Sequence, residues 1–135
     1  VNDYVTIKNG QVINLGFEVD LYVDKNIPRG EIITDTINEI TSYMDINKWD
    51  MGDNIYLSDL IETINNVAGV LNVTDLRVYN KVNENGKYSF NEIAQPYIDD
   101  ATRQVNISRY TLFGIPNGMF EVKYPNKDIK VSVST

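Results

Sequence analysis

Alternating apolar and polar residues predict a strand near the start of the chain. The alternation runs from residue 12 to residue 24, and its apolar side chains are Phe17, Val19, Leu21 and Val23. A period of two places one face of a strand in a core and the other in water. Residues 4–7, followed by Asn9-Gly10, predict an earlier strand that enters a tight turn.

The spacing of apolar residues then becomes helical. Pro28 suits the first turn of a helix, and a stripe follows that consists of Ile33, Ile37, Ile40 and Met44, widened by Ile32 and Tyr43. A second helix is expected from Ser58, acting as its N-cap, to Gly69, a residue that commonly ends helices.

Residues 70–82 predict the next strand. The phase of their apolar positions changes between Val73 and Leu76, which predicts a bulge or bend near Thr74-Asp75.

The last two expected strands cover residues 120–124 and 129–133. Pro125-Asn126-Lys127 between them has the length of a hairpin connection. The whole order is ββααβ followed by a C-terminal β-hairpin. It predicts an α+β fold in which a mixed or antiparallel sheet carries two helices on one face.

Residues 83–118 form a long excursion without a clear period. Loops beyond about 12–15 residues in a compact domain tend to be functional or disordered, and aromatic content argues against disorder. The excursion contains Tyr88, Phe90, Tyr97, Tyr110 and Phe113. Two interpretations stay open: it packs onto the sheet, or it is an arm that docks onto another subunit.

The amino-acid composition limits the kinds of catalytic and metal site that the chain can form. The 135 residues, which we interpret as one domain (1–135), include no cysteine and no histidine. Disulfides, thiolate zinc sites and the commonest general base are thereby excluded. The acid pairs Asp50/Asp53 and Asp99/Asp100 fit solvated loops better than a catalytic pair. We expect no enzymatic activity, no catalytic residue, no cofactor and no metal site.

The net charge of -7 argues against a nucleic-acid partner. Residues 1–69 carry a net charge of -8 and residues 70–135 a net charge of +1. The acids between residues 30 and 66 are Glu31, Asp35, Glu39, Asp45, Asp50, Asp53, Asp59 and Glu62, against Lys48 alone. This cluster is either a solvated face or a docking face for a basic neighbour. No run of 18 apolar residues is present, so no membrane insertion is expected.

The middle of the chain resembles a known family. A strand leads through a proline- and glycine-bearing entry into a helix, then to Asp53-Asn54-Ile55-Tyr56-Leu57-Ser58-Asp59-Leu60-Ile61, and a second helix closes with Val67-Ala68-Gly69-Val70-Leu71-Asn72-Val73. This order resembles the C-terminal domain of baseplate wedge proteins of contractile-tailed phages, the baseplate J-like family. The resemblance covers Leu21–Val82 best, and residues 119–131 resemble the ending of larger phage versions. Ala68, where many relatives carry proline, and the excursion depart from the simpler pattern.

The resemblance implies a structural virion protein in the phage tail baseplate, made in the host cytoplasm. Its partners would be copies of itself and other wedge proteins, and the 135 residues would be the C-terminal part of a longer chain. No catalytic residue is implied. The candidate interface residues are Trp49, Tyr88, Phe90, Tyr97, Tyr110 and Phe113. The alternative is a glycan- or receptor-binding module that uses the loop aromatics.

Overall fold

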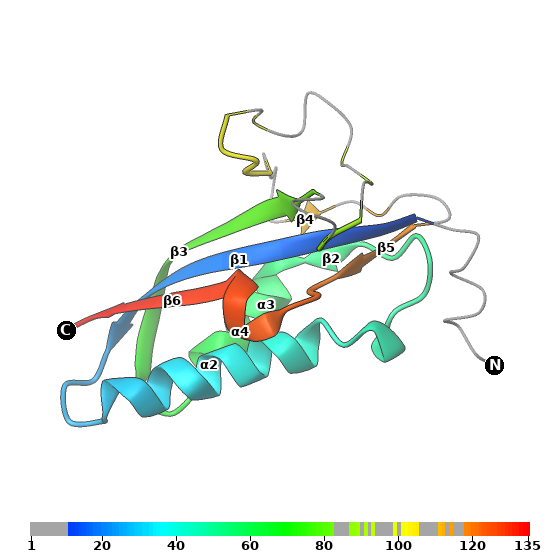
Figure 1. Ribbon diagram of the computed structural model, residues 1–135. Coiled ribbons are helices and arrows are strands. Elements are labelled where there is room, and N and C mark those ends of the chain that lie inside the picture. The colour runs from blue at the N-terminus through cyan, green and yellow to red at the C-terminus, as the bar shows by residue number, and fades with distance from the viewer. Residues whose placement is uncertain are drawn as a thin grey trace.

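A mixed sheet with helices on one face forms the centre of the fold (Figure 1). The computed structural model describes residues 11–82, 87–89, 91, 93, 99, 101–105, 111–112, 114 and 118–135. The expected α+β class is confirmed, whereas the strand expected at residues 4–7 lies outside the described residues.

The central strand β1 (Gln11–Val23) has its predicted alternation. Every second side chain is at most 1% exposed and belongs to the hydrophobic core: Ile13, Leu15, Phe17, Val19, Leu21 and Val23. β3 (Val70–Lys81) pairs antiparallel with β1. Asp20 faces Asp75 and Leu21 faces Val73, so Thr74 is the extra residue of a bulge, and its Oγ1 donates to the Asp20 carbonyl at 3.0 Å. The predicted bulge is confirmed.

The predicted C-terminal hairpin is wrong. β5 (Gly118–Glu121) and β6 (Ile129–Ser134) both pair parallel with β1, one after the other along the same edge. Between them, Pro125 opens a single helical turn, α4 (Pro125–Asp128). A hairpin reverses the chain through residues with positive φ, and among the described non-glycine residues only Arg103 has one. Proline at the first position favours the helical turn instead, so the chain keeps its direction.

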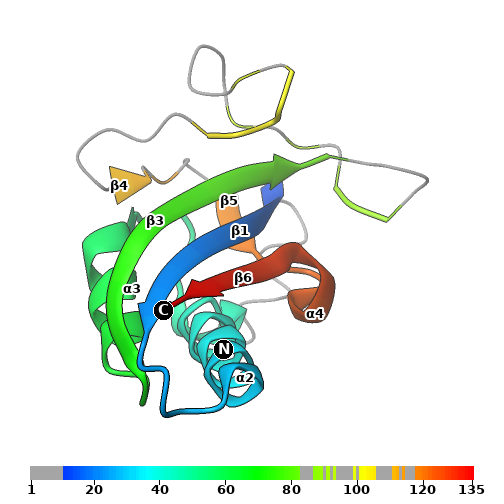
Figure 2. The same ribbon diagram turned by 90° about the vertical axis from the view of Figure 1, so that its left-hand side faces the viewer.

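Two helices cover the core face of the sheet. In α2 (Arg29–Tyr43) the buried residues are Ile32, Thr36 and Ile40, whereas the expected Ile33 and Ile37 are half-buried. Ile32, Ile40 and Met44 of the predicted stripe are thus buried, and Thr36, which was not predicted, completes the buried face. Figure 2 shows α2 between α3 (Leu57–Asn65) and α4.

The ends of α3 differ from the prediction. The helix begins at Leu57, which is buried and directly follows the short strand β2 (Ile55–Tyr56). Its N-cap is therefore Tyr56, the last residue of β2, which makes no side-chain capping bond. Ser58 is exposed in the first turn. α3 ends at Asn65, and Gly69 lies farther on, in the turn before β3, at φ +94°.

The described part of residues 83–118 lies against the sheet. β4 (Thr111–Leu112) pairs with β2, and Gln104 bridges to Tyr79. The Ile93 amide donates to Asn80 Oδ1 at 2.8 Å. These contacts are those expected if the excursion packs onto the sheet. Whether its undescribed residues also reach another subunit stays a prediction.

Asn80 is expected to hold this excursion in place. Its side chain is fully buried, accepts from the Ile93 amide and donates through Nδ2 to the Asn14 carbonyl at 3.4 Å. Asn80→Ala leaves the buried Ile93 amide without this acceptor and removes one donor from the Asn14 carbonyl, and an unsatisfied buried group costs about 1–3 kcal/mol. We expect urea unfolding at lower concentration and faster proteolytic cleavage within 83–118. Asn72→Ala, at an exposed position of the same strand, is the control, and equal cleavage of both variants would contradict the assignment.

Candidate functional site

Of the six candidate interface residues, the structure describes Trp49 and Tyr88. Phe90, Tyr97, Tyr110 and Phe113 lie outside the described residues. Neither described ring stands free on the surface, because Tyr88 is buried and Trp49 is half-buried against the core. The interface role of the six residues stays a prediction, and so does the glycan-binding alternative, which depends on the undescribed aromatics.

Trp49 follows the short helix η1 (Ile46–Lys48) and packs on the end of α2. Its ring meets Tyr43 edge to face, with 5.5 Å between ring centres, and its Nε1 donates to the Tyr43 carbonyl at 2.9 Å. The Tyr43 hydroxyl donates to the Tyr56 carbonyl. Burial raises the pKa of Tyr43, and the charge of Asp59 raises it further. Trp49 therefore anchors the chain between α2 and β2.

Tyr88 connects the excursion to α4. It is 6% exposed, and its hydroxyl donates to the buried Asp128 carboxylate, 2.9 and 3.0 Å from the two oxygens. Its ring meets Tyr124 edge to face at 5.6 Å. The Tyr124 hydroxyl donates to the Lys87 carbonyl at 3.2 Å. These contacts fix residues 87–88 beside α4.

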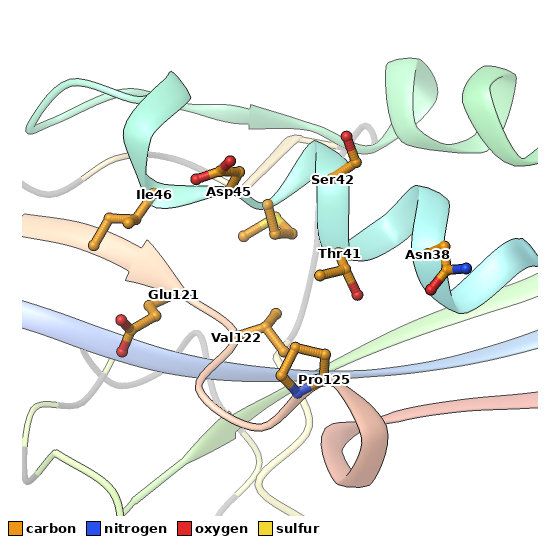
Figure 3. Close-up of a pocket in the computed structure, with 9 residues that line it drawn as sticks. Asn38, Thr41, Ser42, Asp45, Ile46, Glu121, Val122 and Pro125 are labelled. Carbon is orange, nitrogen blue, oxygen red and sulfur yellow. The ribbon is translucent and has the colours of Figure 1, made fainter. Parts of the chain in front are cut away.

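A groove of about 380 Å³ opens between the end of α2, η1 and the β5–α4 connection (Figure 3). Its lining mixes polar and apolar side chains: Asn38, Thr41, Ser42, Met44, Asp45, Ile46, Glu121, Val122 and Pro125. Asp45 accepts from the Asn47 amide, and Glu121 accepts from Asn14 Nδ2. Thr41 donates to the Ile37 carbonyl. Three of these polar side chains thus bind within the chain, Asp45 in a turn, Thr41 in α2 and Glu121 across to β1, and no aromatic ring is among the lining residues.

The acid pairs considered above also have local structural roles. Asp53 Oδ2 accepts from the Asp50 amide at 2.8 Å, and Asp99 Oδ1 accepts from the Ala101 amide at 2.8 Å. Asp100 lies outside the described residues. Within the part of the chain that the structure describes, no group of three acids gathers as a metal site would require.

The outer face of the sheet carries a network around Arg77. Its guanidinium binds Asp20 through two nitrogens, at 3.0 and 3.2 Å, and also binds Glu18 and Asp75. Hydrogen bonding to Asp20 raises the pKa of Arg77 above its ordinary value. The Tyr79 hydroxyl donates to Glu18, and burial followed by this bond raises the pKa of Tyr79. Three carboxylates thus share one guanidinium, and the network as a whole keeps an excess of negative charge.

Lysines that are distant in sequence meet around α4. Lys123 Nζ lies 5.7 Å from the centre of the Tyr124 ring, and Lys127 Nζ lies 5.7 Å from the centre of the Tyr88 ring. Lys87 adjoins both tyrosines, and all three lysines are exposed. We call Lys87, Lys123 and Lys127 the basic patch. Its acid neighbour Asp128 is buried against Tyr88.

Acids gather on the other flank of α2. A groove of about 410 Å³ separates α2 from the turn after α3, and its lining consists of Asp35, Asn38, Glu39, Asn66, Val67 and Ala68. We call it the acidic groove. The eight acids expected to form an acidic face between residues 30 and 66 are all exposed. Among the described residues, the ion pairs are those of Arg77, so Asp35 and Glu39 have none.

Sequence reasoning missed the basic patch. Lys87 and Lys123 are 36 positions apart, and residues 125–127 were expected to form a hairpin turn. Buried Asn14 and Asn80 were also missed, because asparagine is abundant and usually exposed. No local signal distinguishes these two asparagines from the rest.

No protein-family model matches the chain, and no curated protein matches it either. Within the described residues, no helix has both the length and the apolar character that a bilayer crossing demands.

Proposed function

We propose that this chain is a structural component of a phage tail baseplate, a wedge subunit that works by binding copies of itself and other wedge proteins. The observation that carries the proposal is the way the two resembling stretches fold together. Leu21–Val82 supplies α2, α3 and β3, residues 119–131 supply α4 and the start of β6, and both stretches pack around β1. The sequence resemblance thus coincides with one packed unit.

The exposed surface supports the same proposal. Asp35 and Glu39 line one groove beside α2, whereas the exposed lysines Lys87, Lys123 and Lys127 gather around α4. Separated charges favour orientation and specificity in protein–protein contacts. The proposal assigns the chain no catalytic step and no cofactor.

The test is the location of the protein in assembled tails. An antibody against this chain, applied to purified contractile-tail particles, is expected to label the baseplate end in electron micrographs. Antibody absorbed beforehand with the chain serves as the control. Labelling confined to fibres, or absence of the chain from purified particles by mass spectrometry, would contradict the proposal. Saturable binding on a glycan array would favour the glycan-binding alternative.

A further inference from the structure

The basic patch and the acidic groove lie on opposite flanks of α2. Figure 2 shows α4 on one side of α2 and α3 on the other. The lysines of the patch lie around α4, and the residues of the groove belong to α2 and the turn after α3. Asp35 and Glu39 are one helical turn apart on α2, so their carboxylates project side by side. Neither charge is neutralised within the described chain.

The acidic groove has the chemistry to receive lysine side chains. Val67 and Ala68 give it apolar surface, and Asp35 and Glu39 give it charge. A lysine buries its alkyl stem along apolar surface while its ammonium group stays with a carboxylate or water. Lys123 and Lys127 are exposed at and beside a single helical turn, where a second molecule can reach them.

We propose that the basic patch of one copy docks into the acidic groove of a second copy. The two surfaces carry opposite charge, and every copy of the chain has both of them. Two copies can therefore bind each other through the patch of one and the groove of the other. Because they lie on opposite flanks of α2, a molecule cannot fill its own groove. Each contact also leaves one patch and one groove free, so the contact is head-to-tail and continues into a ring or a filament.

The inference rests on the proposed function, since it supplies the self-contact that a repeated baseplate subunit needs. Both surfaces are small and exposed, so a single contact is expected to be weak and sensitive to salt. Closure of a ring would add the strength of many such contacts.

Sedimentation equilibrium of the 135-residue chain tests the contact directly. At 50 mM NaCl the wild-type chain is expected to associate reversibly, and the association constant is expected to fall about tenfold or more by 0.5 M NaCl because of screening. A single monomeric species at about 1 mM protein and low salt, where even weak contacts are populated, would overturn the proposal.

Charge reversal identifies the two surfaces. K123E/K127E removes the basic patch, and D35K/E39K reverses the acidic groove, so each variant alone is expected to lose self-association by about tenfold or more. K25E/K48E is the matched control, since it changes the net charge as much as K123E/K127E at exposed lysines elsewhere. Circular dichroism checks that each variant is folded. If K25E/K48E lost as much self-association as K123E/K127E, the assignment of the contact to the basic patch would be contradicted.

Mixing the two reversed variants gives the decisive result. In the mixture the acidic patch of K123E/K127E faces the basic groove of D35K/E39K, and the native patch of D35K/E39K faces the native groove of K123E/K127E. Association is therefore expected to return in the mixture although each variant alone is monomeric. Failure to return would overturn the head-to-tail contact. Antibody labelling of the baseplate does not depend on this result. The self-contact and the proposed function can therefore fail separately.

Discussion

Replacement of Phe17 by alanine is expected to lower the free energy of unfolding by about 3–5 kcal/mol, the usual cost of removing a buried aromatic side chain. Phe17 is 1% exposed at the middle of β1, where it faces Val78 of β3 and Ile129 of β6. All three residues belong to the core under the helices. A cavity here borders several elements at once, so little relaxation can fill it.

Urea unfolding followed by the fluorescence of Trp49, the single tryptophan, measures this loss. Tyr22→Ala is the control, because Tyr22 lies on the opposite face of the same strand and is 46% exposed. Its effect is expected to stay within about 1 kcal/mol. A loss below about 1.5 kcal/mol for Phe17→Ala would contradict close packing at this point of the sheet.

Gly69→Ala is expected to cost about 2–4 kcal/mol, through backbone strain and overpacking together. Gly69 adopts φ +94°, a conformation that L side chains rarely take. A Cβ at this position would lie 2.8 Å from Ile32 Cδ1 and 3.1 Å from Ile27 Cγ2. The Gly69 carbonyl also accepts from the Asp24 amide at 2.8 Å, so a shift of this turn would disturb the end of β1.

Gly30→Ala is the matched control for this change. A Cβ on Gly30 meets nothing within 4 Å, and the residue lies in the first turn of α2. The substitution is therefore expected to stabilise the protein by about 0.5–1 kcal/mol. Thermal unfolding should move the two variants in opposite directions.

The two causes at Gly69 can be separated. Ile32→Val removes the Cδ1 atom that the new Cβ would strike. In a double-mutant cycle, Gly69→Ala is expected to cost less in the Ile32→Val background than in the wild type, with the difference giving the share that comes from Cδ1, while Cγ1, 2.9 Å from the new Cβ, stays in both backgrounds. Strictly additive losses would mean that the Cδ1 contact contributes nothing to the cost.

The periodicity of apolar residues correctly predicted those features of the fold that depend only on neighbours in the sequence. The alternation along β1 gave its core face, and the phase change near Thr74 gave the bulge. In α2 the predicted Ile32, Ile40 and Met44 are buried, but Ile33 and Ile37 are half-buried, because Thr36 takes the fully buried position between Ile32 and Ile40. The geometry of helix packing, rather than hydropathy, chose the buried side.

The candidate site was less predictable than the fold. Trp49 and Tyr88 were singled out as aromatic, but their partners Tyr43 and Asp128 come from α2 and α4. The exposure of the acids between residues 30 and 66 followed the usual behaviour of charge. Their division by α2 from the lysines near α4 did not follow from the sequence, because it depends on segments far apart in the chain.

The sequence by itself determined the α+β class, the buried face of β1, the β3 bulge and the exposure of the acidic residues. Each of these depends on local period or on the solvation of single side chains. Only the tertiary structure decided that β6 continues along the edge of β1 instead of folding back, and that Lys87, Lys123 and Lys127 lie beside the same two tyrosines, Tyr88 and Tyr124. A strand's partner and a patch's composition depend on contacts between distant segments, and local hydropathy carries no information about those contacts.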